Sequence, residues 1–213
     1  MTNVDCGELL EFNPKIILIL CLIPVVYIWT LPLLSYIDFS EDGCYNGIEE
    51  HCKLGHSISA YISNSQATGA MAFAFSFPIT IMWLYKPKDI SITPLIIFTL
   101  FFGLFLICSV TYNINLHLIT VFTFCFAAIF HFILFTRSLK MSKHVAKFFW
   151  FLIIVSSSCL VLLMVLGSIF MKNIKKDNPP LQNTYWVWIF ECIGLTSFIL
   201  FTPTYLLLNN NNS

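Results

Sequence analysis

Six long apolar blocks constrain this chain more than any other feature of its sequence. Each block is close to the ~20 residues that a helix rising 1.5 Å per residue needs to cross ~30 Å of hydrocarbon. Lys and Arg together number 11, as do Asp and Glu, and Glu191 alone among these charged residues lies inside a block. The blocks cover residues 16–37, 65–85, 92–112, 117–135, 148–171 and 185–208.

The blocks predict an all-α polytopic membrane protein, a bundle of six transmembrane helices. Backbone amides in lipid must be paired within their own segment, and no block alternates as a membrane β-strand does. Only 10% of the residues are charged and 58% are hydrophobic, whereas about a quarter of a soluble domain is charged. We expect a tail at 1–15, a membrane domain at 16–208 with a long loop at 38–64, and an Asn-rich tail at 209–213.

The distribution of basic residues predicts that both termini are cytosolic. In this orientation seven Lys and Arg residues are cytosolic and four, Lys53, Lys172, Lys175 and Lys176, are not. Such a bias follows the positive-inside rule, although the cluster at 172–176 favours the opposite orientation. The loop at 38–64 is acidic and becomes lumenal or extracellular. The acidic tail at 1–15 does not resemble a cleavable signal peptide, so we expect the first block to remain as a signal anchor.

The 38–64 loop carries two cysteines, Cys44 and Cys52, in a compartment where disulfides persist. We expect a Cys44–Cys52 disulfide. The alternative is a metal site, because His51 and His56 flank Cys52, but a single Cys and His run without a second paired motif is a weak zinc signal. We therefore expect no metal.

Two histidines, His117 and His131, share the fourth block. Fourteen residues of helix place them near one face, ~21 Å apart along the axis, a separation that suits two stacked haems. Such haems also need facing histidines on neighbouring helices, and the second, third, fifth and sixth blocks contain none. No cofactor is expected, and the overall charge balance argues against a nucleic-acid partner, which leaves membrane lipids and a possible membrane-protein partner.

Glu191 is the leading candidate for a functional residue. It lies two turns into the last block, ~9 Å below its lumenal start, where an unpaired carboxylate costs about 2.5 kcal/mol or more. We predict a polar pocket for a ligand or lipid headgroup beneath the lumenal headgroups, with a structural hydrogen bond between helices as the alternative. The predicted pocket residues are His56, Ser57, Ser59, Asn113, Asn115, His117 and Glu191.

The sequence gives little reason to expect catalysis or conduction. No serine in a glycine-rich elbow is predicted to face a histidine on another helix, and no second intramembrane acid completes an acid–base pair. No catalytic residue is predicted, and whether the chain is an enzyme stays open. A pore is not expected either, because no block repeats polar residues along one face.

The segment His56-Ser57-Ile58-Ser59-Ala60-Tyr61-Ile62-Ser63 resembles the Ser-Ile-Ser-Ala motif of a superfamily of six-helix membrane proteins. This superfamily contains the damage-regulated autophagy modulators (DRAM), the FGF-receptor-activating protein with its relatives in GPI-anchor lipid remodelling, and the yeast suppressor of four-kinase protein. A cysteine-bearing loop after the first block, His117 at the start of the fourth and Glu191 early in the sixth agree with this resemblance.

The resemblance implies a multipass protein of Golgi, lysosomal or plasma membranes that modulates autophagy or membrane lipid organisation. The alternative function is GPI-anchor lipid remodelling, as an enzyme or enzyme subunit. It is motivated by Asn64-Ser65-Gln66, which lacks the Pro-Glu of the autophagy branch. A small-solute transporter is a third possibility, but it predicts an internal repeat that the sequence does not show.

Overall fold

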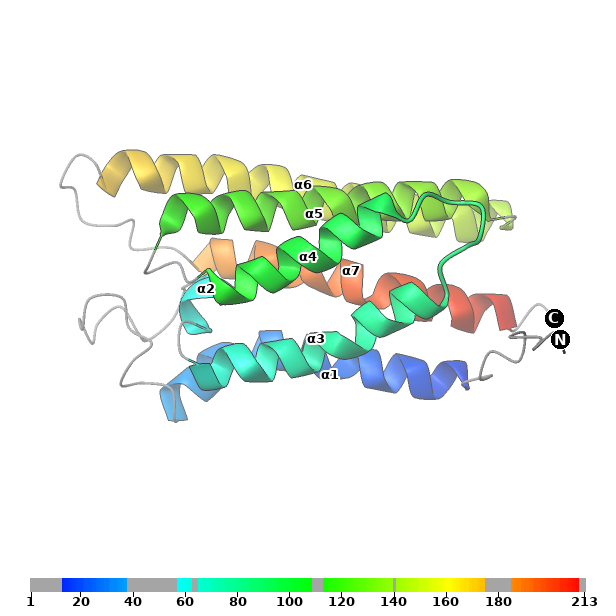
Figure 1. The fold of residues 1–213 in the computed structure, drawn as a ribbon, viewed down its shortest axis with the longest axis horizontal. Helices are drawn as coiled ribbons and strands as arrows, with labels where there is room; N and C mark the ends of the chain where they lie inside the picture. Colours follow the sequence, from blue (N-terminus) through cyan, green and yellow to red (C-terminus); the bar gives the residue numbers. More distant parts are fainter. Residues whose placement is uncertain are drawn as a thin grey trace, which may run out of the picture.

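The computed structural model describes residues 13–37, 57–62, 65–108, 113–139, 141–174 and 185–210. Every regular element in these ranges is helical, which confirms the all-α prediction for the described part of the chain. The helices are α1 (Pro14–Ile37), α2 (Ile58–Tyr61), α3 (Ser65–Leu84), α4 (Thr93–Ile107), α5 (Ile114–Ser138), α6 (Lys143–Ile174) and α7 (Tyr185–Asn210). All but α2 lie side by side along the long axis of one bundle (Figure 1).

Five helices, α1, α3, α5, α6 and α7, are long and apolar enough to cross a membrane. Large apolar side chains cover their outer faces, including Ile19 at 62% and Phe73 at 66% exposure. Such a surface is suited to lipid tails and not to water, because soluble domains rarely expose extended apolar patches. The chain is therefore an integral, multi-pass membrane protein.

The helix α4 is shorter than the sequence suggests. It has 15 residues and ends at Ile107, so it covers roughly 22 Å at 1.5 Å per residue, less than the ~30 Å hydrocarbon core. Residues 109–112 of the expected third span lie outside the described residues. The helix runs obliquely across the bundle beside α5 (Figure 1), and a sixth crossing stays a prediction.

The helix α7 occupies a central position, packing against both α1 and α6 and also contacting α2 and α3. Its contact with α1 includes a hydrogen bond from Trp188 Nε1 to the carbonyl of Ile28 (3.3 Å) and one from Trp29 Nε1 to Thr196 Oγ1 (3.0 Å). The two tryptophan rings meet edge to face, with 5.6 Å between their centroids. The helix also continues through Asn210, two residues into the tract that the sequence assigns to a tail.

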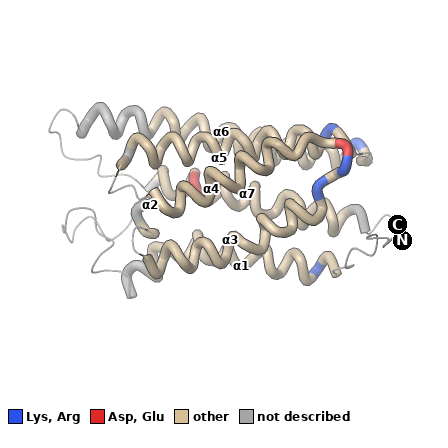
Figure 2. The backbone as a smooth tube through the Cα atoms, viewed as in Figure 1, with Lys and Arg blue, Asp and Glu red and all other residues tan. Residues whose placement is uncertain are grey.

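The charged residues that Figure 2 colours are distributed unequally between the two ends of the bundle. The Lys and Arg residues among them lie at the end where α1 begins and α7 ends. These residues are Lys15, Lys86, Lys88, Arg137, Lys143 and Lys147; Lys172, near the end of α6, is not among them. Of the two described acidic residues, Asp89 lies at the same end and Glu191 lies within the bundle toward the opposite end (Figure 2).

Candidate functional site

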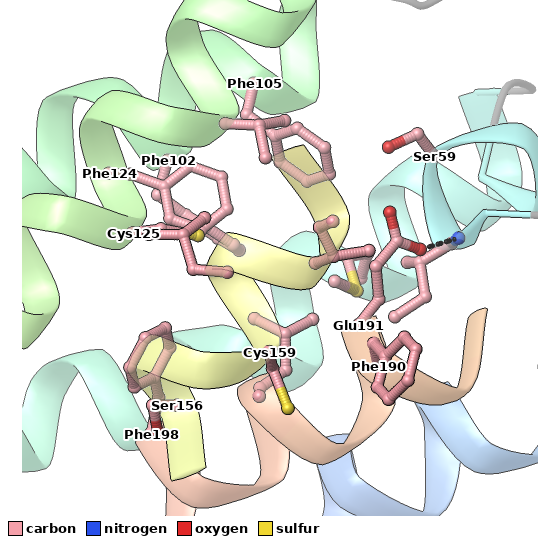
Figure 3. A pocket seen from close by; sticks show the side chains of 17 residues that line it. Ser59, Phe102, Phe105, Phe124, Cys125, Ser156, Cys159, Phe190, Glu191 and Phe198 are labelled. Carbon is pink, nitrogen blue, oxygen red and sulfur yellow. Dashed lines mark hydrogen bonds between the residues drawn. The ribbon is translucent and has the colours of Figure 1, made fainter. Parts of the chain in front are cut away.

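Glu191 lies in the second turn of α7, and its carboxyl group bonds to a neighbouring segment of the chain. Its Oε2 accepts a hydrogen bond from the backbone N–H of Ile58, the first residue of α2 (Figure 3). The residue is partly exposed. A backbone N–H or a carboxyl group without a hydrogen-bond partner costs free energy in a low-dielectric setting. This bond gives the N–H of Ile58 and the carboxyl of Glu191 a partner each.

The short helix α2 is held in the bundle by its apolar side chains. Ile58 is 2% exposed, and Tyr61 and Ile62 are also buried. A four-residue helix is not stable by itself, so these contacts and the Glu191 bond determine where α2 lies. Ser59 follows Ile58 directly and is placed by the same contacts.

Ser59 is hydrogen-bonded to a histidine from another helix. Its Oγ lies 2.9 Å from Nε2 of His117 in α5, and the other ring nitrogen, Nδ1, lies 2.7 Å from the carbonyl oxygen of Cys108. A carbonyl oxygen can only accept, so Nδ1 carries the proton. In a neutral imidazole Nε2 then accepts, and Ser59 Oγ–H donates to it.

His117 is buried, at 3% exposure, and its surroundings hold the ring in one orientation. Phe105 of α4 packs against it with 5.2 Å between the ring centroids. The backbone carbonyl of His117 accepts a hydrogen bond from Thr120 Oγ1 at 2.7 Å. With both ring nitrogens also bonded, the imidazole is fixed relative to Ser59.

Ser59 and Glu191 border one small cavity of about 40 Å³ that six helices enclose. Figure 3 shows both side chains at one side of this cavity, with aromatic rings and cysteines around the rest. The other lining residues are mostly apolar: Ile58, Met71, Phe102, Phe105, Val121, Phe124, Cys125, Ser156, Cys159, Leu160, Leu163, Phe190, Gly194, Leu195 and Phe198. The cavity is therefore mostly apolar, with Ser59 and Glu191 at one side.

The volume of the cavity limits what it can hold. It exceeds the 10–15 Å³ that one water requires, but it is far below the 300–1,000 Å³ of a pocket that encloses a drug-sized ligand. A small group at the end of a larger molecule fits this space, while a whole lipid does not. The partial exposure of Glu191 and Phe190 leaves the remainder of such a molecule outside the bundle.

The structure brings together only some of the predicted pocket residues. Ser59, His117 and Glu191 meet around α2, and Ser57 lies at its amino-terminal side, partly buried. Asn113 instead caps α5, its side chain accepting a hydrogen bond from the N–H of Leu116 at 3.0 Å. Asn115 is exposed on α5 and is not among the residues that line the cavity.

The remaining predictions for this region fall on residues that the structure does not describe. His56 and the proposed Cys44–Cys52 disulfide lie outside the described residues. The five cysteines that are described, Cys21, Cys108, Cys125, Cys159 and Cys192, all have free thiols. No group of three or more His, Cys, Asp or Glu side chains within the described ranges is arranged to hold a metal ion.

The second histidine of α5 has a different environment from His117. His131 is completely buried, and neither of its ring nitrogens has a hydrogen-bond partner among the described residues. It packs instead beside Phe132 and Phe135, with centroid distances of 5.6 and 6.2 Å.

The sequence did not predict that the hydroxyl of Ser59 would be hydrogen-bonded to the imidazole of His117. The two residues stand 58 positions apart, and Ser59 follows no glycine-rich turn that would have drawn attention to it. The apolar half of the cavity was missed as well, because phenylalanines that line it do not differ in pattern from those that face lipid. The one available signal was the placement of Ser59 and His117 near the same predicted membrane boundary.

No protein-family model, curated protein or solved structure matches this chain in comparisons of its sequence and fold.

Proposed function

We propose that this chain is a DRAM-like multipass membrane protein that modulates membrane lipid organisation or autophagy by binding lipid at the Ser59–Glu191 cavity. The observation that carries the proposal is the composition of that cavity, a carboxyl group and a hydroxyl at one side and aromatic rings at the other. A lipid has polar and apolar groups in the same order, from its polar headgroup through the ester to the hydrocarbon chain. Its partners are membrane lipids, with a second membrane protein as a further candidate.

The size of the cavity indicates which part of a lipid is bound. About 40 Å³ accommodates an ester or hydroxyl group and the first few carbons attached to it. The rest of the lipid stays in the bilayer, beside the partly exposed Phe190 and Glu191. Binding of this kind requires no soluble domain and no large enclosed pocket.

The proposed topology has six crossings and places both termini in the cytosol. Most of the described basic residues lie where α1 begins and α7 ends (Figure 2), which supports this orientation through the positive-inside rule. The cavity then belongs to the lumenal or extracellular leaflet. A protein with this topology fits the Golgi, the lysosome or the plasma membrane.

Lipid binding can be tested with the full chain in liposomes that contain a diacyl lipid with a photoreactive group near its ester. We expect crosslinks to concentrate on the cavity-lining parts of α6 and α7, and to fall several-fold in Glu191→Gln. The matched control is Asn115→Ala, at the same end of the bundle but facing outward. Crosslinks spread evenly over the outer faces and unchanged in Glu191→Gln would refute lipid binding here.

A cellular experiment tests the consequence of binding. In cells that lack the native copy, Glu191→Gln should change lipid distribution or autophagic flux while leaving the protein inserted and abundant. Wild-type behaviour of this variant would remove the case for the site.

GPI-anchor lipid remodelling is the second candidate function. It is favoured by the hydrogen bond between Ser59 and His117, because remodelling exchanges ester-linked chains and needs a group that can attack an ester. Profiling of GPI lipid chains in a strain that lacks this protein separates the two candidates. Unchanged chains would eliminate remodelling and leave lipid binding untouched.

A further inference from the structure

The arrangement around Ser59 has the parts that an activated serine nucleophile requires. A serine hydroxyl is a weak nucleophile unless a positioned base takes its proton, and the base must in turn be oriented by a third group. Here Nε2 of His117 lies 2.9 Å from Ser59 Oγ, within the range expected for a nucleophile and its base. The carbonyl of Cys108 orients the ring by accepting from Nδ1 at 2.7 Å.

The Ser59 side chain also has access to a site where a substrate group fits. Ser59 lines the cavity and His117 does not, and the Ser59 hydroxyl is hydrogen-bonded to His117. An ester group placed in the cavity would lie beside Ser59, with the first carbons attached to it among Phe102, Phe105 and Phe124.

Glu191 influences Ser59 through the backbone. Its Oε2 binds the N–H of Ile58, the residue that precedes Ser59, and so helps to hold α2 against α5. We assign Glu191 as a positioning residue for Ser59. Its loss should misplace the hydroxyl relative to His117 Nε2.

We propose that Ser59 is the nucleophile and His117 the general base of an acyl-transfer site that acts on ester-linked chains of membrane lipids. This rests on the proposed binding of lipid at the same cavity. Ser59 Oγ attacks the ester carbonyl carbon while its proton moves to His117 Nε2. The bond to the lipid alcohol then breaks, and Nε2 returns the proton to the departing alcohol oxygen.

The acyl group is then carried as an ester on Ser59. In the second half of the reaction, water or the hydroxyl of another lipid attacks this ester and gives its proton to Nε2. The acyl group leaves as a fatty acid or as a new ester, and Ser59 Oγ recovers the proton. No oxidant, reductant or metal enters the balance of either step.

The test uses a fluorophosphonate with an alkyl tail, which reacts with activated serines, on the full chain in liposomes. Peptide mass spectrometry should place the adduct on Ser59, with no adduct at this position in Ser59→Ala. His117→Gln should slow the labelling roughly 100-fold or more, the usual contribution of a general base. Ser197→Ala is the matched control, because Ser197 is a buried serine of α7 whose hydroxyl donates to the carbonyl of Ile193 and which is not among the cavity-lining residues.

The wild-type measurement decides the question even if a variant fails to fold. A folded wild-type chain with Ser59 unlabelled overturns the proposal, as does labelling of Ser59 at an equal rate in folded His117→Gln. Photoreactive-lipid crosslinking of the same sample separates the two proposals. Crosslinks at the cavity without Ser59 labelling would overturn acyl transfer alone, and the absence of both would overturn lipid binding as well.

Discussion

The hydroxyl of Ser59 in α2 and the imidazole of His117 in α5 form a hydrogen bond of 2.9 Å inside the bundle. The residue next to Ser59 is bonded in turn to Glu191 of α7. Two side-chain bonds thus connect a four-residue helix to two membrane-embedded helices. The following predictions depend on these bonds, on the adjoining cavity and on the orientation of the bundle.

Replacement of Glu191 should separate its hydrogen-bonding role from its charge. Glu191→Ala leaves the N–H of Ile58 without its acceptor, which costs about 1–3 kcal/mol in a buried setting. Glu191→Gln retains a carbonyl oxygen at the same reach and should retain much of this stability. Unfolding in detergent micelles, followed by helical circular dichroism, measures the difference, with Asn115→Ala as a neutral control. An equal loss of stability in Glu191→Gln and Glu191→Ala would mean that the carboxylate charge, and not the hydrogen-bond acceptor, stabilises this region.

The Ser59–His117 bond should appear as a coupling energy in a double-mutant cycle. Removing either partner of a hydrogen bond makes the second removal less costly, so Ser59→Ala and His117→Ala should be less than additive. Hydrogen bonds between membrane helices contribute about 0.6–2 kcal/mol, which gives the size of the expected coupling. The same micelle unfolding experiment measures it. Strict additivity of the two changes would show that the residues do not interact in the folded protein.

Gly194 lies where α7 approaches Cys159 of α6 and lines the cavity. A Cβ at this position would lie 3.5 Å from the Cβ of Cys159, an ordinary contact, so Gly194→Ala should be accepted. Its higher helix propensity should stabilise the protein by up to about 1 kcal/mol. Gly194→Leu should instead fill the cavity and reduce photoreactive-lipid crosslinking.

The control for this change is Gly103→Leu in α4, because Gly103 is not among the cavity-lining residues and has open space around it. Crosslinking should survive in this variant. A loss of crosslinking in Gly103→Leu equal to that in Gly194→Leu would indicate general damage to the bundle and not a filled cavity.

The orientation of the bundle makes a prediction about the two ends of the chain. Because most of the described basic residues lie where α1 begins and α7 ends (Figure 2), we expect this end to face the cytosol. Tags placed on both termini should then be cleaved together by protease added to the cytosolic side of intact vesicles. Protection of one tag and cleavage of the other would require an odd number of crossings and would remove α4 as a span.

Protection of both tags would reverse the orientation and place the cavity in the cytosolic leaflet. Selective permeabilisation of the plasma membrane, followed by antibody staining of each tag, gives an independent measurement. Both results should agree.

The sequence by itself determined that this chain is a bundle of membrane helices. Long apolar blocks cannot be solvated by water, and a backbone in lipid must pair its amides within each segment, so composition and length were enough. Composition and length also identified Glu191 as a candidate functional residue, since burying a lone carboxylate in an apolar block costs free energy whichever way it faces. Length alone could not decide whether α4, which ends at Ile107, crosses the membrane.

Only the tertiary structure decided which groups meet. The partner of Glu191 is the backbone N–H of Ile58, and almost every residue has such a group, so no sequence pattern marks it. From the sequence, Asn113 and Asn115 were equally good candidates for residues of the pocket. Two residues of helix turn the chain by about 200°, so a structure that directs His117 inward must direct Asn115 outward. The pairing of Ser59 with His117 depends on how α2 folds against α5, and that packing is a property of the whole bundle.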